Sequence, residues 1–131
     1  MRQIIILLFF FQMSVYGQAN SEDYKIHTKL YFSELISNGN THRGTNIKLK
    51  ANEVIDASIS LKSRNENETA PAITSLILYV PGYPEINIEG NQIDRETALK
   101  IQKTKAGDVI VIKPGTENDS RITVLQIEIT E

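Results

Sequence analysis

The stretch that decides the fold is Ile73-Thr74-Ser75-Leu76-Ile77-Leu78-Tyr79-Val80, which carries apolar residues at both odd and even positions. An extended run of this kind is typical of a central strand that is covered on both faces of its sheet. Pro81 cannot donate a hydrogen bond to a neighbouring strand, so it ends the run. The continuous apolar segment Val109–Ile112 predicts a second central strand.

One segment between these two runs has a helical pattern, from Asp94 to about Lys105. Asp94 is a good N-cap because its carboxylate can accept hydrogen bonds from the free N–H groups of the first turn. Glu96 adds negative charge at the positive end of the helix dipole. Gly107 is a natural helix stop. The sequence therefore predicts one short helix at residues 94–105.

Shorter runs of alternating apolar and polar residues predict the other strands, at residues 24–33, 47–51, 55–61, 85–88 and 121–130. The apolar phase shifts near Glu53-Val54, which predicts a bulge or tight turn, or else a helical turn over residues 51–56. The last run changes parity between Val124 and Leu125, so we expect a bulge or a passage between two sheets. Residues 38–44 and 64–69 are predicted loops, because they are polar and the first contains Asn-Gly and Arg-Gly pairs.

Together these segments predict a mainly β, β-sandwich-like fold of about seven strands and one helix. The chain of 131 residues is long enough for one domain and hardly for two. We expect residues 20–131 to form this single β-rich domain.

The first residues have the layout of a secretory signal peptide. A short positive start at Arg2 is followed by the apolar run Ile4–Phe11, and small residues appear near Gly17 and Ala19. The run is much shorter than the roughly 20 residues that span a bilayer, so no stable membrane insertion is expected. We predict that residues 1–19 are a leader, cleaved after Gly17 or Ala19, and that the protein is periplasmic or secreted.

Composition excludes several classes of function. The net charge is −2, which gives no electrostatic footprint for nucleic acid or anionic lipid. The chain has no cysteine, so disulfides and thiolate metal sites are impossible. Glycines occur singly at turns and form no phosphate-binding loop. No cofactor is predicted.

No catalytic constellation is evident. His27 and His42 lack neighbouring ligands at metal-binding spacing, so no metal site is predicted. Asp56, Asp94 and Asp108 each have a structural role available. A small periplasmic hydrolase or carbohydrate-active enzyme is the alternative, and it requires two or three of these five side chains to meet in a cleft. A structural subunit or an inhibitor is a third possibility.

Aromatic residues next to a rigid turn offer a different kind of site. Tyr79 and Tyr83 flank Pro81-Gly82, and Pro84 follows. Tyrosines held in this way provide contact area at low entropic cost, so Tyr79, Tyr83 and Pro84 are the candidate binding residues. The simpler interpretation is that Tyr79 packs in the core and Tyr83 covers one end of the sandwich.

The order of several segments resembles a known family. These segments are Ile47-Lys48-Leu49-Lys50-Ala51-Asn52-Glu53-Val54, the strand from Ile73, Gly90-Asn91, the predicted helix, Lys105-Ala106-Gly107-Asp108-Val109-Ile110-Val111-Ile112, and Arg121-Ile122. Over residues 47–131 the chain is similar to the C-terminal domain of GldM, a component of the gliding-motility and type IX secretion machinery of Bacteroidetes.

The resemblance implies a periplasmic β-rich domain that acts through protein–protein contacts and is not an enzyme. Its expected partner is another exported or cell-envelope protein, and the oligomeric state is left open. GldM-like proteins have a membrane-spanning N-terminal helix and several further domains. The leader and single domain predicted here therefore imply a free-standing exported relative, and not the motor component.

Overall fold

Two β-sheets face each other in the computed structural model, which describes residues 29–117 and 121–131. The strands are β1 (Leu30–Ser37), β2 (Asn40–Arg43), β3 (Ile47–Lys50), β4 (Ser58–Ser63), β5 (Ser75–Tyr79), β6 (Ile86–Glu89), β7 (Val109–Gly115), β8 (Arg121–Ile122) and β9 (Leu125–Thr130). The helices are α2 (Ala51–Ile55) and α3 (Arg95–Gln102). The predicted mainly β, two-layer fold is confirmed.

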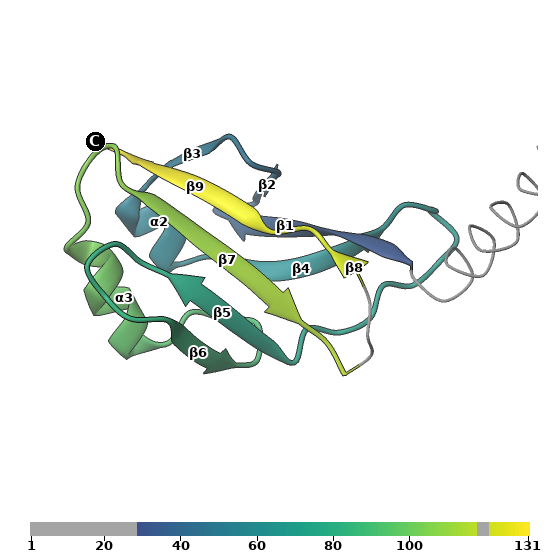
Figure 1. Cartoon of the computed structure of the whole chain (residues 1–131). Helices are drawn as coiled ribbons and strands as arrows, with labels where there is room; N and C mark the ends of the chain where they lie inside the picture. The colour runs from purple at the N-terminus through teal and green to yellow at the C-terminus, as the bar shows by residue number, and fades with distance from the viewer. Residues whose placement is uncertain (1–28, 118–120) are drawn as a thin grey trace, which may run out of the picture.

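The two sheets differ in size and connection. One has the order β2-β1-β4, with β8 paired in parallel to the start of β1. The other has the order β3-β9-β7-β5-β6, in which only β3 and β9 are parallel. Figure 1 shows the five-stranded sheet in front of β1 and β4, with both helices towards one end.

The core lies between the sheets and follows the two-residue period of the strands. In β5, Leu76 and Leu78 are fully buried, and in β7, Ile110 and Ile112 are fully buried. Leu35 and Ile59 oppose them from the four-stranded sheet, where they are direct cross-strand partners. The apolar residues that the alternating pattern assigns to the inner face are thus the ones that are buried.

The prediction that β5 is covered on both faces is wrong, and β7 beside it is likewise covered on one face only. Tyr79 is 37% exposed and Val109 is 43% exposed, both on the outer face of the five-stranded sheet. Ile77 and Val111 on the same face are half-buried. Both strands are central within their sheet, as predicted, but their outer face keeps apolar side chains in contact with solvent.

The helices depart from prediction in extent and number. Asp94 is the N-cap of α3, as predicted, and its carboxylate accepts a hydrogen bond from the Thr97 N–H at 2.8 Å. The helix ends at Gln102 with Lys103 as C-cap, so Gly107 is not its stop. Gly107 instead lies in the turn before β7, with φ of 94°. The alternative helical turn after β3 is confirmed as α2.

Nine strands are present in the described residues, two more than the sequence predicts. The added β2 forms a hairpin with β1 from residues that were predicted as loop. The predicted last strand is divided into β8 and β9, which belong to different sheets. This confirms that the chain passes between the layers, and Thr123 lies at the passage.

Candidate interaction surface

Tyr79 lies at the end of β5 and on the outer face of the five-stranded sheet. Its hydroxyl donates a hydrogen bond to Glu85 Oε1 at 2.8 Å. The Nζ atom of Lys113 lies 5.2 Å from the centroid of its ring, which is within the range of a cation–π contact. The ring is therefore held from two sides while more than a third of the residue stays accessible to a partner.

Four apolar residues share this face and form what we call the Tyr79 cluster, namely Ile77, Tyr79, Val109 and Val111. Tyr79 is directly opposite Val111 in the β5–β7 ladder. Ile77 and Val109 follow two residues away on the same strands, so all four point to the same side. The register between β5 and β7 joins them into one apolar surface.

Charged residues surround the Tyr79 cluster. Lys48 on β3 forms a long ion pair with Glu128 on β9, with 3.8 Å between Nζ and Oε2. Lys113 and Glu85 lie beside Tyr79, and Glu89 lies further along β6. An apolar centre with a charged rim is the arrangement of residues found in protein–protein interfaces.

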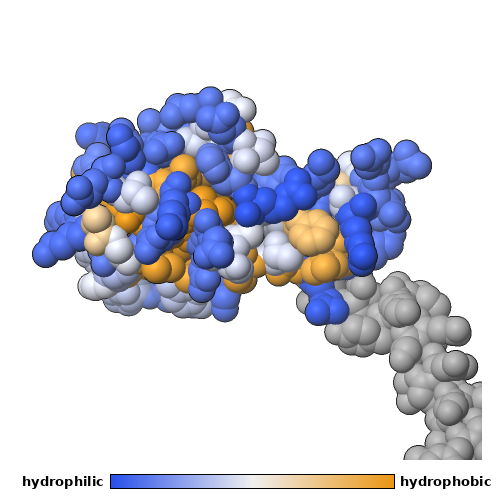
Figure 2. All heavy atoms as spheres, turned by 90° about the horizontal axis from the view of Figure 1, so that it is seen from above, coloured by the Kyte–Doolittle hydropathy of each residue, from blue (hydrophilic) through white to orange (hydrophobic). Residues whose placement is uncertain are grey.

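The hollow beside the Tyr79 cluster is small. A shallow hollow of about 190 Å³ lies next to Val109, between β3, β7 and β9. It is smaller than the roughly 300 Å³ at which small-molecule pockets begin. On the side of the molecule seen in Figure 2, hydrophobic atoms reach the surface between hydrophilic side chains. The geometry suits a macromolecular surface better than a small molecule.

The other two predicted binding residues lie in different surroundings. Tyr83 closes a turn in which its N–H donates to the carbonyl of Val80 at 3.1 Å. Its half-buried ring packs against the core, with Lys100 Nζ of α3 at 5.4 Å from the centroid. Pro84 is exposed beside it. Tyr83 thus covers one end of the sandwich, whereas Tyr79 does not pack in the core.

The residues considered for catalysis have structural roles or positions in the fold. Asp94 caps α3, and Asp108 Oδ2 accepts a hydrogen bond from the Lys105 N–H at 2.9 Å. Asp56 is the C-cap of α2, and His42 lies on β2 opposite Leu35. His27 lies outside the described residues. Within residues 29–117 and 121–131, no group of three or more His, Asp or Glu side chains could hold a metal ion.

Sequence reasoning found Tyr79 but missed Val109, Val111 and Lys113 as its neighbours. The continuous apolar run of β7 was interpreted only as a second central strand, so its odd positions were not considered as part of a binding surface. Lys113 follows that run directly and points to the same face of β7 as Val109 and Val111. A lysine at this position was the available signal that the outer face is exposed to solvent.

No protein-family model matches the sequence, and no curated protein matches it. In the described part of the chain, neither helix is long and apolar enough to cross a membrane. The Tyr79 cluster is therefore interpreted from its own geometry.

Proposed function

We propose that this protein is an exported, non-catalytic protein–protein interaction module that binds another exported or cell-envelope protein. The observation that carries the proposal is the Tyr79 cluster, an apolar surface with a charged rim on a sheet face that the described elements leave uncovered. Tyrosine is among the residues that dominate binding energy at interfaces, because it buries a large ring at a small entropic cost.

The geometry supports binding by contact more than the enzymatic alternative. The carboxylates of Asp94 and Asp108 accept hydrogen bonds from backbone N–H groups. Among residues 29–117 and 121–131, no group of three or more His, Asp or Glu side chains could hold a metal ion. An acid–base mechanism needs such groups within hydrogen-bond reach of one substrate. A binding surface needs exposed apolar side chains that a partner can cover, and the Tyr79 cluster offers them on the outer face of the five-stranded sheet.

Export is the second part of the proposal and rests on the leader-like residues 1–19 and on the resemblance to the GldM C-terminal domain. We expect intact mass spectrometry of the protein from producing cells to find a mature N-terminus at Gln18 or Asn20. The reason is that the apolar run Ile4–Phe11 has the length that the secretion machinery recognises. Leu7→Arg should interrupt this run and leave the chain uncleaved. A chain that retains residues 1–19 without this change would contradict export.

The interaction surface is tested by a photo-reactive phenylalanine analogue at position 79 in cells that make the protein. We expect irradiation to give one discrete higher-mass adduct, because the exposed ring of Tyr79 is placed against the partner. Thr41 is the matched control position, since it is exposed on β2 in the opposite sheet and lies outside the Tyr79 cluster.

The adduct should be lost when Val109→Asp places a charge in the cluster, because an unpaired charge in an interface loses its hydration. Thermal unfolding should verify that this exposed substitution leaves the domain folded. Equal adducts at positions 41 and 79, or none at 79, would overturn the proposal.

A further inference from the structure

The outer edge of β4 is open along part of its length. β4 pairs with β1 on one side, and its other side is an edge of the four-stranded sheet. Near the start of β4, Asn91 occupies this edge: the Ile59 N–H donates to the carbonyl of Asn91 at 3.0 Å, and Asn91 Nδ2 donates to the carbonyl of Ile59 at 3.2 Å. Asn91 thus makes the contacts that a residue of a neighbouring strand would make.

Beyond Ile59, no residue in the described part of the chain occupies the same edge in this way. In an antiparallel ladder, every second residue points its N–H and C=O to the same side, so Leu61 and Ser63 face outward as Ile59 does. Their partners across the ladder, Ser33 and Tyr31, direct backbone groups away from β4 to Thr123. Within the described residues, no backbone hydrogen bond satisfies the outward N–H and C=O of Leu61.

A groove runs along this open edge. It has a volume of about 330 Å³ and lies between β4 and the extended segment before β5. It is lined by Ile59, Ser60, Leu61, Pro71, Ala72, Ile73 and Asn91. The edge groups of Leu61 therefore face a space with an apolar opposite wall, where a hydrogen-bonding backbone could be received.

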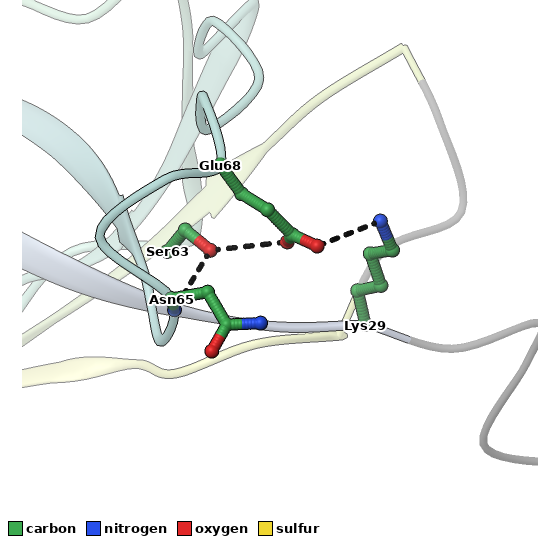
Figure 3. Close-up of polar contacts among 4 residues, drawn as sticks. All are labelled: Lys29, Ser63, Asn65 and Glu68. Carbon is green, nitrogen blue, oxygen red and sulfur yellow. Dashed lines mark hydrogen bonds and ion pairs between the residues drawn. The ribbon is translucent and has the colours of Figure 1, made fainter.

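At the far end of this edge, the loop after β4 (residues 64–69) is fixed by hydrogen bonds to the end of β4 and to Lys29. Figure 3 shows that Glu68 joins Ser63 to Lys29. Ser63 Oγ donates to Glu68 Oε2 at 3.3 Å, and Lys29 Nζ donates to Glu68 Oε1 at 3.3 Å. The Asn65 N–H donates to Ser63 Oγ at 3.2 Å. These contacts hold residues 65–68 of the loop against the end of β4 and the residue before β1.

We propose that the open edge of β4 binds an extended peptide segment of a partner protein, which adds a strand beside Leu61 and Ser63. Only a backbone offers the alternating donors and acceptors that an open strand edge pairs with. The apolar wall at Ala72 and Ile73 receives an apolar side chain of the peptide. Lys62 is exposed between the two edge residues and forms no ion pair in the described part of the chain, so it favours an acidic residue opposite.

This site goes beyond the proposed function, because it assigns a second contact with its own ligand class and does not depend on the Tyr79 cluster. The probe is a capped hexapeptide of alternating valine and glutamate, added to the purified protein. Amide hydrogen exchange followed by NMR should slow at Leu61 and Ser63 by about tenfold or more, since each gains a hydrogen-bonded neighbour. The same peptide with its alternate amides methylated should give no protection.

Two substitutions separate specific binding from loose association. Ala72→Trp should fill the groove and abolish the protection, while Leu99→Trp on the exposed face of α3 should leave it unchanged. Lys62→Glu should weaken binding of the glutamate peptide by about threefold and strengthen binding of its lysine counterpart, as expected for an exposed ion pair.

The two proposals can fail independently of each other. Protection that is absent at millimolar peptide, equal with the methylated peptide, or unchanged in Ala72→Trp would overturn the edge site and leave the Tyr79 proposal standing. A failed cross-link at position 79 would not affect the edge site, because Tyr79→Ser is expected to bind the peptide as the unaltered protein does.

Discussion

Replacing Leu78 by alanine is expected to lower the free energy of unfolding by about 3 kcal/mol, within the range measured for buried leucines. Leu78 is fully buried in β5, the strand between β6 and β7. Its cross-strand neighbours are Ile86 on β6 and Ile112 on β7. Truncation would remove buried methyl groups and leave a cavity that two paired strands cannot close.

Leu99→Ala is the matched control, because it makes the same chemical change on an exposed side chain. Leu99 is 54% exposed on α3, so its replacement should change stability by less than about 0.5 kcal/mol. Urea unfolding measures both variants, with the midpoint shifted and the slope unchanged in Leu78→Ala. Equal midpoints for the two variants would mean that β5 does not lie in the core.

The parts of the fold that could be predicted from sequence are those fixed by local chemistry. The N-cap role of Asp94 follows from the free N–H groups of any helix start, and it holds in the structure. The strand at β5 follows from an apolar run that ends at a proline. The passage of the last strand between layers could be predicted only as one of two possibilities, since a parity change fits a bulge equally well.

The hairpin of β1 and β2 shows why other parts could not be predicted. Asn38 and Gly39 both have positive φ, 52° and 79°, as the two-residue turns of tight hairpins require. The Asn-Gly pair was therefore the correct signal. The strand after it, Asn40–Arg43, has no apolar alternation, because it lies at a sheet edge and is largely exposed. Without that alternation the segment was predicted as a loop.

The candidate surface depends on information that is not local. Tyr79 could be singled out from its turn, but Val111 becomes its neighbour only through the register of β5 with β7. Apolar residues on both parities of a strand do not reveal whether the second face is covered by protein or left for a partner. Here the described elements leave it open, and this is the physical basis of the proposed binding role.

The second large effect is expected at Thr123, which ties the passage between the sheets to β1. The buried Ser33 donates its backbone N–H to Thr123 Oγ1 at 2.8 Å, and its hydroxyl donates to the Thr123 carbonyl. The Thr123 N–H donates in turn to the carbonyl of Tyr31 at 3.1 Å. Thr123→Val should cost about 2 kcal/mol, because it keeps the volume but leaves the Ser33 N–H buried without an acceptor.

Two further variants identify the lost acceptor as the cause. Thr123→Ser keeps the hydroxyl and should retain most of the stability, whereas Thr45→Val, at an exposed threonine, should stay within about 0.5 kcal/mol of the unaltered protein. Hydrogen exchange at the Ser33 amide should accelerate in Thr123→Val and not in Thr123→Ser. If valine and serine at position 123 gave the same stability, the hydrogen bond to Ser33 would contribute nothing. The backbone contacts of residue 123 with the Ser33 hydroxyl and the Tyr31 carbonyl would then be sufficient to hold the passage on β1.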